Sequence, residues 1–176
     1  AVSGDGRVVV TGSKGGKVWD PASGDCLRTL EGHSDEITSV AVSGDGRVAV
    51  MGSSDKTAKV WDLASGAFLR TLESHSSSIR SVAVSGDGRV VVTGSEDKTA
   101  KVWDPASGAC LCTLEGHSNV VTGVAVSDDG RVVATGSKDK TARVWGLPGL
   151  GSKSSQGLLF SEARKPYAEA AGHGRR

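Results

Sequence analysis

The chain has 176 residues, and its 21 Lys and Arg nearly balance 20 Asp and Glu, so the formal net charge is +1. This balance gives no electrostatic reason to expect binding to nucleic acid or to an acidic membrane surface. These residues contain no secretory signal and no apolar run near the ~20 residues of a membrane helix. The cysteines Cys26, Cys110 and Cys112 lack the spacing of a disulfide framework. We therefore expect free thiols in a reducing compartment, the cytoplasm or alternatively the nucleus.

Aromatic and histidine residues recur along the chain with one fixed period. The chain opens at Ala1 inside a repeating unit, and we expect it to be a fragment of a longer protein. Successive tryptophans lie 42 residues apart, at Trp19, Trp61, Trp103 and Trp145. The histidines His33, His75 and His117 keep the same 42-residue spacing. A fixed period of this length predicts stacked or radially packed supersecondary units.

One unit, from His75 to Gly116, contains four short apolar-rich runs separated by Gly, Asp, Ser and Pro turns. The runs are 79–84, 89–93, 99–103 and 109–114. Such runs predict a four-stranded antiparallel meander, and the absence of a helical period predicts an all-β chain. One such sheet cannot bury its two apolar faces alone, so neighbouring units must cover them. A ~40–45-residue unit of four strands matches one blade of a β-propeller.

Two dipeptides recur in phase with this period. Gly32-His33 and Gly116-His117 form one pair, and Trp61-Asp62 and Trp103-Asp104, like Trp19-Asp20, form the other. Through them the region 1–147 resembles the WD40 repeat family. The resemblance implies an incomplete β-propeller of about three full four-stranded antiparallel blades and a partial one. Closing its ring needs missing blades or a second chain, so self-association is one expectation.

The third unit holds a hydroxyl, an imidazole, a carboxylate and an indole, in His75, Thr93, Asp97 and Trp103. A hydrolase triad uses similar groups. The resemblance implies instead a structural tetrad, in which the Trp donates to the hydroxyl, the hydroxyl to the His, and the His to the Asp. The set recurs in the fourth unit as His117, Thr135, Asp139 and Trp145. Because it recurs and no GxSxG motif accompanies it, we expect architecture and not an enzyme.

The tetrads of the first two units are incomplete. The second unit keeps His33, Asp55 and Trp61, but Met51 replaces the hydroxyl residue. Its His33 and Trp61 lose their shared neighbour unless water or a backbone group substitutes. The first unit keeps Thr11 and Trp19, and Gly15-Gly16 stands where later units read Asp-Lys-Thr-Ala. We therefore expect local stability to fall toward the N-terminus.

The loops after each histidine and the second turns differ among the units, whereas the first turns barely change. The resemblance places these variable loops on one rim of the propeller. Binding residues commonly lie on loops held by a rigid scaffold. The candidate contacts for protein partners are Asp35, Glu36, Arg80, Glu96, Asn119 and Lys138. The alternative is that they are ordinary solvated residues that drifted among duplicated copies.

The function favoured by these features is a protein–protein interaction scaffold. A ring of Lys56, Lys98 and Lys140 makes nucleic-acid binding conceivable, but neighbouring Asp residues offset it and stacking aromatics are scarce. We find no P-loop, metal-ligand cluster or nucleophile elbow, so we expect no cofactor and no metal. The alternative is an accessory region of a larger signalling or enzymatic protein, an NTPase or kinase, whose catalytic domain lies outside this sequence.

The repeat pattern stops near Gly146. Residues 148–176 are predicted to be a Gly/Ser-rich linker followed by a basic, disordered tail. Within it, 158–160 is an apolar run that could form the outer strand of the last blade.

Overall fold

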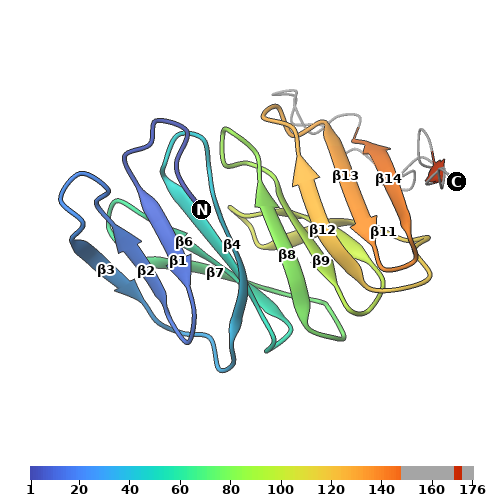
Figure 1. Cartoon of the computed structure of the whole chain (residues 1–176), viewed down its shortest axis with the longest axis horizontal. Coiled ribbons are helices and arrows are strands. Elements are labelled where there is room, and N and C mark those ends of the chain that lie inside the picture. The colour runs from blue at the N-terminus through green and yellow to red at the C-terminus, as the bar shows by residue number, and fades with distance from the viewer. Residues whose placement is uncertain (148–168, 172–176) are drawn as a thin grey trace, which may run out of the picture.

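The computed structural model describes residues 1–147 and 169–171, and these residues fold into four antiparallel sheets placed side by side (Figure 1). The described residues contain no helix. The all-β prediction is therefore confirmed, as is the division into repeated sheets.

Each sheet corresponds to one repeat of the tryptophan period. The first sheet contains β1 (Val9–Gly12), β2 (Gly16–Trp19) and β3 (Cys26–Leu30). The second contains β4 (Ile37–Val42), β5 (Val48–Ser53), β6 (Thr57–Asp62) and β7 (Phe68–Glu73). The third contains β8 (Ile79–Val84), β9 (Val91–Ser95), β10 (Ala100–Asp104) and β11 (Ala109–Leu114). The fourth contains β12 (Val121–Val126), β13 (Val132–Ser137), β14 (Thr141–Gly146) and β15 (Glu169–Ala171).

Turn chemistry sets the strand boundaries in every sheet. The first turn places Gly46, Gly88 and Gly130 at φ of 70–72°, the left-handed region that glycine enters without steric cost. A β-bulge between Val102 and Trp103 shifts the register of the outer strand pair, and the same shift precedes Trp19 and Trp61. The sequence predicted strands 79–84 and 109–114 at their observed bounds, whereas β9 begins two residues later than expected.

The hydrophobic core lies between sheets, because each sheet has two apolar faces. We call the face turned toward the next sheet along the chain the forward face, and the other the backward face. At the middle interface, Val50 and Val60 on the forward face of the second sheet pack with Ile79, Val82 and Trp103 on the backward face of the third. Equivalent clusters join the first sheet to the second and the third to the fourth. Every internal interface therefore repeats one packing pattern.

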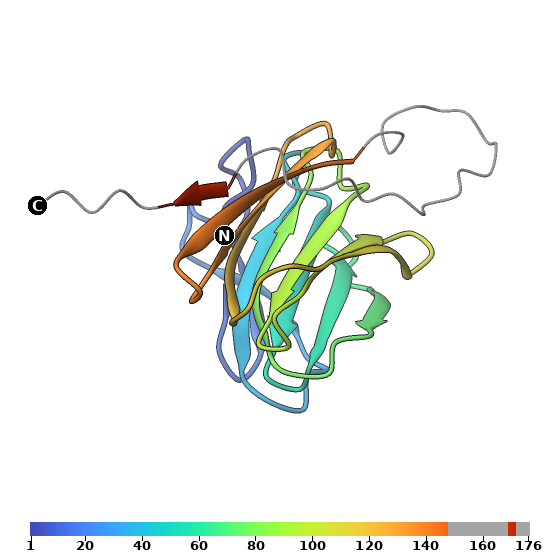
Figure 2. The same cartoon turned by 90° about the vertical axis from the view of Figure 1, so that its right-hand side faces the viewer.

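The array of sheets is not closed. The first and last sheets lie at its opposite ends in Figure 1, and Figure 2 faces the end formed by the last sheet. Contacts between the sheets follow the chain order, β1 with β4, β4 with β8 and β8 with β12. In the first sheet an isolated bridge between Val2 and Val9 stands where the other sheets have a full inner strand. An unclosed set of blades was predicted, and the structure confirms it.

The fourth strand of the last sheet comes from the predicted tail. β15 pairs antiparallel with β14, with Ala142 opposite Ala170. The sequence placed an outer strand at 158–160, which lies outside the described residues, and treated the region around 169–171 as tail. Backbone pairing with an open edge needs no apolar pattern in the added strand, so 169–171 carries no side-chain signal from which this strand could have been predicted.

Candidate binding rim and its tetrads

The third sheet brings His75, Thr93, Asp97 and Trp103 into one hydrogen-bonded chain. The indole Nε1 of Trp103 lies 2.9 Å from Thr93 Oγ1, which lies 2.7 Å from His75 Nε2. The other ring nitrogen, Nδ1, lies 2.7 Å from Asp97 Oδ2. The four residues come from β9, β10, the loop before β8 and the turn after β9. The chain thus ties two strands, a loop and a turn together.

The donors and acceptors in this chain fix where its protons lie. An indole N–H can only donate, so Thr93 accepts from Trp103 and must donate its own proton to His75 Nε2. His75 then carries its proton on Nδ1 and donates it to Asp97. Thr93 is fully buried, so its hydroxyl is closed to solvent, and both its donor and its acceptor are already in use. The geometry suits holding the sheet together and leaves no approach for a substrate.

The electrostatics keep this imidazole neutral and this carboxylate charged. Burial lowers the pKa of His75, and this outweighs the neighbouring Asp97 carboxylate, which raises it. Burial tends to raise the pKa of Asp97, but hydrogen bonds from Thr99 and His75 outweigh it and bring the value below the usual range. Asp97 also accepts the backbone N–H of Ser76, which fixes the loop that follows the histidine.

The fourth sheet repeats this geometry. Trp145 donates to Thr135 at 3.0 Å, and His117 lies 2.8 Å from both Thr135 and Asp139. Hydrogen bonds from Thr141 and His117 outweigh burial and hold the pKa of Asp139 far below its ordinary value. The two full sets predicted from the sequence therefore form two closely similar networks.

The second sheet holds its histidine by a different contact. His33 Nδ1 lies 2.7 Å from Asp55, but its Nε2 faces the backbone carbonyl of Met51 at 3.1 Å. The Met51 carbonyl thus takes the place of the missing hydroxyl on the histidine side, but it can only accept, so Nε2 of His33 has to donate here, the reverse of its role in the full tetrads. On the tryptophan side nothing replaces the hydroxyl: within the described residues the indole N–H of Trp61 has no hydrogen-bond acceptor. Trp61 instead contacts His33 and Phe68 by their rings.

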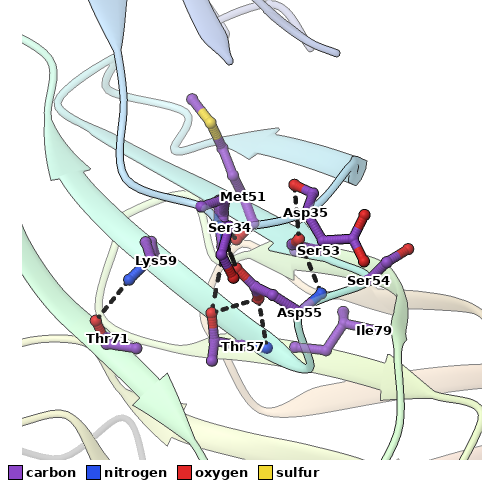
Figure 3. A network of polar contacts seen from close by, with 12 residues as sticks. Ser34, Asp35, Met51, Ser53, Ser54, Asp55, Thr57, Lys59, Thr71 and Ile79 are labelled. Carbon is purple, nitrogen blue, oxygen red and sulfur yellow. Dashed lines mark hydrogen bonds and ion pairs between the residues drawn. The ribbon is translucent and has the colours of Figure 1, made fainter. Parts of the chain in front are cut away.

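The turn that contains Asp55 is nevertheless held by several hydrogen bonds to this carboxylate (Figure 3). Asp55 accepts from the Thr57 hydroxyl at 2.7 Å and from the backbone N–H groups of Ser34 and Thr57. Burial tends to raise the pKa of Asp55, but bonds from Thr57 and His33 lower it to about 2. The equivalent Thr99 and Thr141 bind Asp97 and Asp139 in the same way. These threonines were not among the site residues predicted from the sequence, although the repeated Asp-Lys-Thr signalled them.

The first sheet has the least of this network. Trp19 donates to Thr11 at 2.9 Å, but this bond is exposed, and neither an imidazole nor a carboxylate continues it. The turn at Ser13 to Gly16 is two residues shorter than its later counterparts.

The variable loops do lie together in each sheet. Where the second turn varies, the backbone N–H donates to the carbonyl of the residue just before the inner strand. The three bonds are Ser54 to Glu36 at 3.0 Å, Glu96 to Ser78 at 3.0 Å, and Lys138 to Val120 at 2.9 Å. Ser53 and Asp35 add a second link in the second sheet (Figure 3). We call this set of loops the rim.

The candidate contacts on the rim differ in the bonds that they already make. Arg80 and Glu96 form an ion pair with each other, at 2.9 Å from Arg80 Nε. The hydrogen bond from Arg80 lowers the pKa of Glu96, and the charge of Lys138 in the next sheet adds to this effect. Asp35 and Asn119 each accept the N–H of the following residue, while Glu36 and Lys138 extend exposed ends. The structure thus places acidic groups on the second sheet and an exposed cation on the fourth.

A hollow of about 620 Å³ opens beside the acidic loop. It is lined by Ser13, Lys14, His33, Ser34, Asp35 and Glu36. It adjoins the shortened turn of the first sheet, next to a second open hollow along Lys14, Gly15 and Lys17. Lys14 and Ser13 are rim residues that the sequence analysis missed, and the two-residue deletion was the signal for them.

The lysines of the second turns have an unusual backbone conformation. Lys56, Lys98 and Lys140 have φ of 72°, 72° and 69°, the left-handed conformation that residues other than glycine seldom adopt. The same turn conformation therefore recurs at all three lysines, in addition to their positive charge. The sequence had raised them as a basic ring.

Four repeated sheets, of which the second, third and fourth are each pinned by a histidine loop, define a propeller-type repeat protein. The WD domain, G-beta repeat, matches residues 24–62, 66–104 and 108–146, and the chain belongs to this WD40 family. Each match begins beside the outer strand of one sheet and ends on the third strand of the next, so every sequence repeat spans two sheets. Comparison with curated proteins gave no match.

The residues that the structure describes, 1–147 and 169–171, show neither a membrane-spanning helix nor a metal-ligand cluster. None of their elements is a helix long and apolar enough to cross a membrane. In the same part of the chain, His, Cys, Asp and Glu do not gather into a group able to hold a metal ion. The described cysteines are unpaired, and burial raises the pKa of Cys112 to about 11, with a smaller contribution from Cys110.

Proposed function

We propose that this chain is a protein-binding scaffold and that its contact surface is the rim. The observation that carries the proposal is the hydrogen bond joining the two variable loops in the second, third and fourth sheets, since it holds together the positions where the repeats differ. The tetrads hold the histidine loops of the rim in place. A scaffold function is the general property of WD40 repeat domains, and the choice of the rim is specific to this chain.

The rim combines a rigid base with chemically distinct tips. Asp97 and Asp139 each accept a hydrogen bond from the backbone N–H of the residue that follows the histidine. These bonds fix the loops before a partner arrives, so little loop entropy is lost on binding. The tips run from the exposed Asp35 and Glu36 on the second sheet to the exposed Lys138 on the fourth. An acidic end and a basic end favour a partner whose charges have the opposite order.

The test is quantitative affinity purification with a charge-swapped rim. Glu36→Lys with Lys138→Glu neutralises the acidic end, where Asp35 remains, reverses the basic end and leaves the net charge unchanged. The matched control, Asp25→Lys with Arg47→Glu, makes the same exchange on exposed turns at the other ends of the strands. We expect proteins retained by the wild type and the control to be lost from the rim variant by at least about tenfold.

Folding is checked separately, because a misfolded rim variant would also lose its partners. Circular dichroism and thermal unfolding should match for the three proteins, since all four positions are exposed. Retention of the same partners by a folded rim variant would contradict the proposal. Loss from the control instead would place the contact surface on the opposite turns.

A further inference from the structure

The two end faces of the array fit each other, and we propose that a second copy of this chain packs on them head to tail. The forward face of the last sheet in one copy covers the backward face of the first sheet in the other. This surface is separate from the rim, and the inference does not depend on the proposed function. It rests on three internal interfaces that show what such a face binds.

At each internal interface a glycine on the second strand receives the inner strand of the next sheet. A Cβ added to Gly12 would stand 2.5 Å from Ile37 Cγ2, one on Gly52 2.6 Å from Ile79 Cγ2, and one on Gly94 2.8 Å from Val121 Cγ1. Real Cβ contacts are not that short, so the glycine is what admits the branched side chain. Gly136 is the next member of the series, and no described atom lies within 4 Å of its added Cβ. The last sheet therefore carries the socket without the residue that fills it.

The apolar side chains around this socket are uncovered. Val50 and Val92 on the forward faces of the second and third sheets are 0% exposed, whereas their counterpart Ala134 is exposed. Likewise Val90 is 3% exposed and its counterpart Val132 is 45% exposed. The forward face of the last sheet thus carries the same kinds of apolar residue as the forward faces of the second and third sheets. Those faces are buried by the next sheet, whereas this one is exposed.

Polar groups between inner strands show the same difference. Thr38 of the second sheet donates to the carbonyl of Ile79 in the third at 2.6 Å, in addition to Gly52 of its own sheet. Its counterpart Thr122 contacts only Gly136 of its own sheet among the described residues, at 3.4 Å. An inner-strand carbonyl of an added sheet would complete this pattern.

The opposite end has matching uncovered positions on its backward face. Val2 corresponds to Val84, which packs on the same cluster as Val48, but Val2 is 58% exposed. Added Cβ atoms on Gly88 and Gly130 would meet Val48 and Val90 of the preceding sheets, whereas one on Gly6 meets nothing within 4 Å. Trp19 is half-buried, while the three later tryptophans are 1–4% exposed.

These pairs are complementary in the way that successive sheets of this chain are, and one copy carries both members of each pair, so a second copy supplies the cover that each end face lacks. By the internal pattern, Val132 of one copy is the neighbour of Val2 and Gly6 of the other, as Val90 is of Val126 and Gly130. The contact is head to tail, and such contacts close a ring when the rotation allows. Two copies supply eight sheets, and propellers of roughly 4–8 blades are known to close.

The test is the molar mass of the 176-residue chain in solution, measured by light scattering over a concentration series, with the pair of end positions varied. We expect twice the 17.9 kDa of one chain. Val132→Glu and Val2→Lys each leave a charge facing an apolar surface, so each should raise the dissociation constant at least about tenfold. The double variant places opposite charges across the contact and should recover most of that loss.

Leu69→Glu is the matched control, since Leu69 is an exposed apolar residue of the second sheet, away from both end faces. It should leave the mass unchanged. A monomeric wild type, or a dimer indifferent to Val132→Glu, would overturn the proposal. A dimer broken by Val132→Glu but not restored by adding Val2→Lys would mean that two forward faces pair, which also contradicts it. Mass that grows without limit would show open filaments in place of a ring.

Discussion

Met51 fills the space that a side chain on Gly16 would take. A Cβ added to Gly16 would stand 2.5 Å from the Met51 Sδ, which is too close for two atoms that are not bonded to each other. One interface later the same two positions hold Ala58 and Thr93, and the next holds Ala100 and Thr135. The defect in the second tetrad is therefore one half of a packing exchange with the first sheet: a longer apolar side chain on one side, and no side chain on the other.

Restoring both halves should recover the tetrad. Met51→Thr supplies the hydroxyl that Trp61 and His33 lack but leaves a void next to Gly16, while Gly16→Ala alone displaces the end of Met51, at a cost of about 1 kcal/mol. In the double variant the methyl group added by Gly16→Ala fills the void left by Met51→Thr, and the shorter side chain that Met51→Thr introduces removes the clash caused by Gly16→Ala. We expect a favourable coupling of about 1–2 kcal/mol in urea unfolding of the two single variants and the double variant. Additive effects would mean that the two positions do not interact.

The hydroxyl of a full tetrad should matter far more than that of the exposed first one. Thr93→Val keeps the shape of the side chain but leaves Trp103 and His75 buried without their shared bond, which costs about 1–3 kcal/mol. Thr11→Val is the matched control, because the Trp19 N–H can reach water, and its effect should stay within about 0.5 kcal/mol. Chemical denaturation measures both. Equal losses at the two sites would show that the tetrad adds nothing beyond packing.

The strands and tetrad residues could be predicted because each repeat carries its own local signals. Turn glycines bound the runs, and a 42-residue period fixes which residues share a sheet. Substitution by a backbone group was one of the two alternatives expected at His33, but the Met51 carbonyl could not be singled out, since a backbone carbonyl leaves no trace in the identity of its residue. The Arg80–Glu96 pair was missed for another reason: both were judged singly as rim contacts, and only the pairing of β8 with β9 sets them beside each other.

The ends of the array were harder still. The pattern indicated that the array is open, but Val132 and Val90 look alike in sequence, and only the folded chain shows that one is uncovered. The strand at 169–171 was not predicted, because edge pairing depends on backbone groups that every residue carries. Features that depend on side-chain identity could therefore be predicted from the sequence. Features that depend on backbone groups, or on whether a neighbouring sheet is present, could not.

Acidification should weaken the fold in two stages. The pKa of His75 is lowered by burial, so below its ordinary 6.5 the unfolded chain takes up a proton that the folded chain refuses. Asp55 behaves alike in a lower range: its ordinary pKa is 3.8 and its folded value about 2. In both cases the unfolded state binds more protons, so stability falls as pH falls. The Asp55 share is about 2 kcal/mol, lost between about pH 5 and 2.

Urea unfolding at a series of pH values checks this dependence, and His75→Gln is the diagnostic variant. It should reduce the loss between neutral pH and about pH 5 while leaving the lower stage in place. A stability that rises on acidification from neutral pH, or a first stage unchanged in His75→Gln, would show that the buried imidazole is not the group that titrates.

Amide exchange rates should depend on how complete the tetrad of each sheet is and on whether neighbouring sheets bury both of its faces. β9 lies between two sheets and above a full tetrad, so its amides should exchange slowest. β5 is as deeply buried but lacks the hydroxyl, and β1 has one open face and an exposed Trp19–Thr11 bond, so protection should fall in that order. Each step should be at least about threefold in exchange rate. The measurement is made on Val132→Glu, because a second copy on the first sheet would protect β1 and hide the gradient. Equal protection of β1 and β9 in that variant would contradict the ranking, whereas protection of β1 that appears only in the wild type would be a mark of the head-to-tail contact.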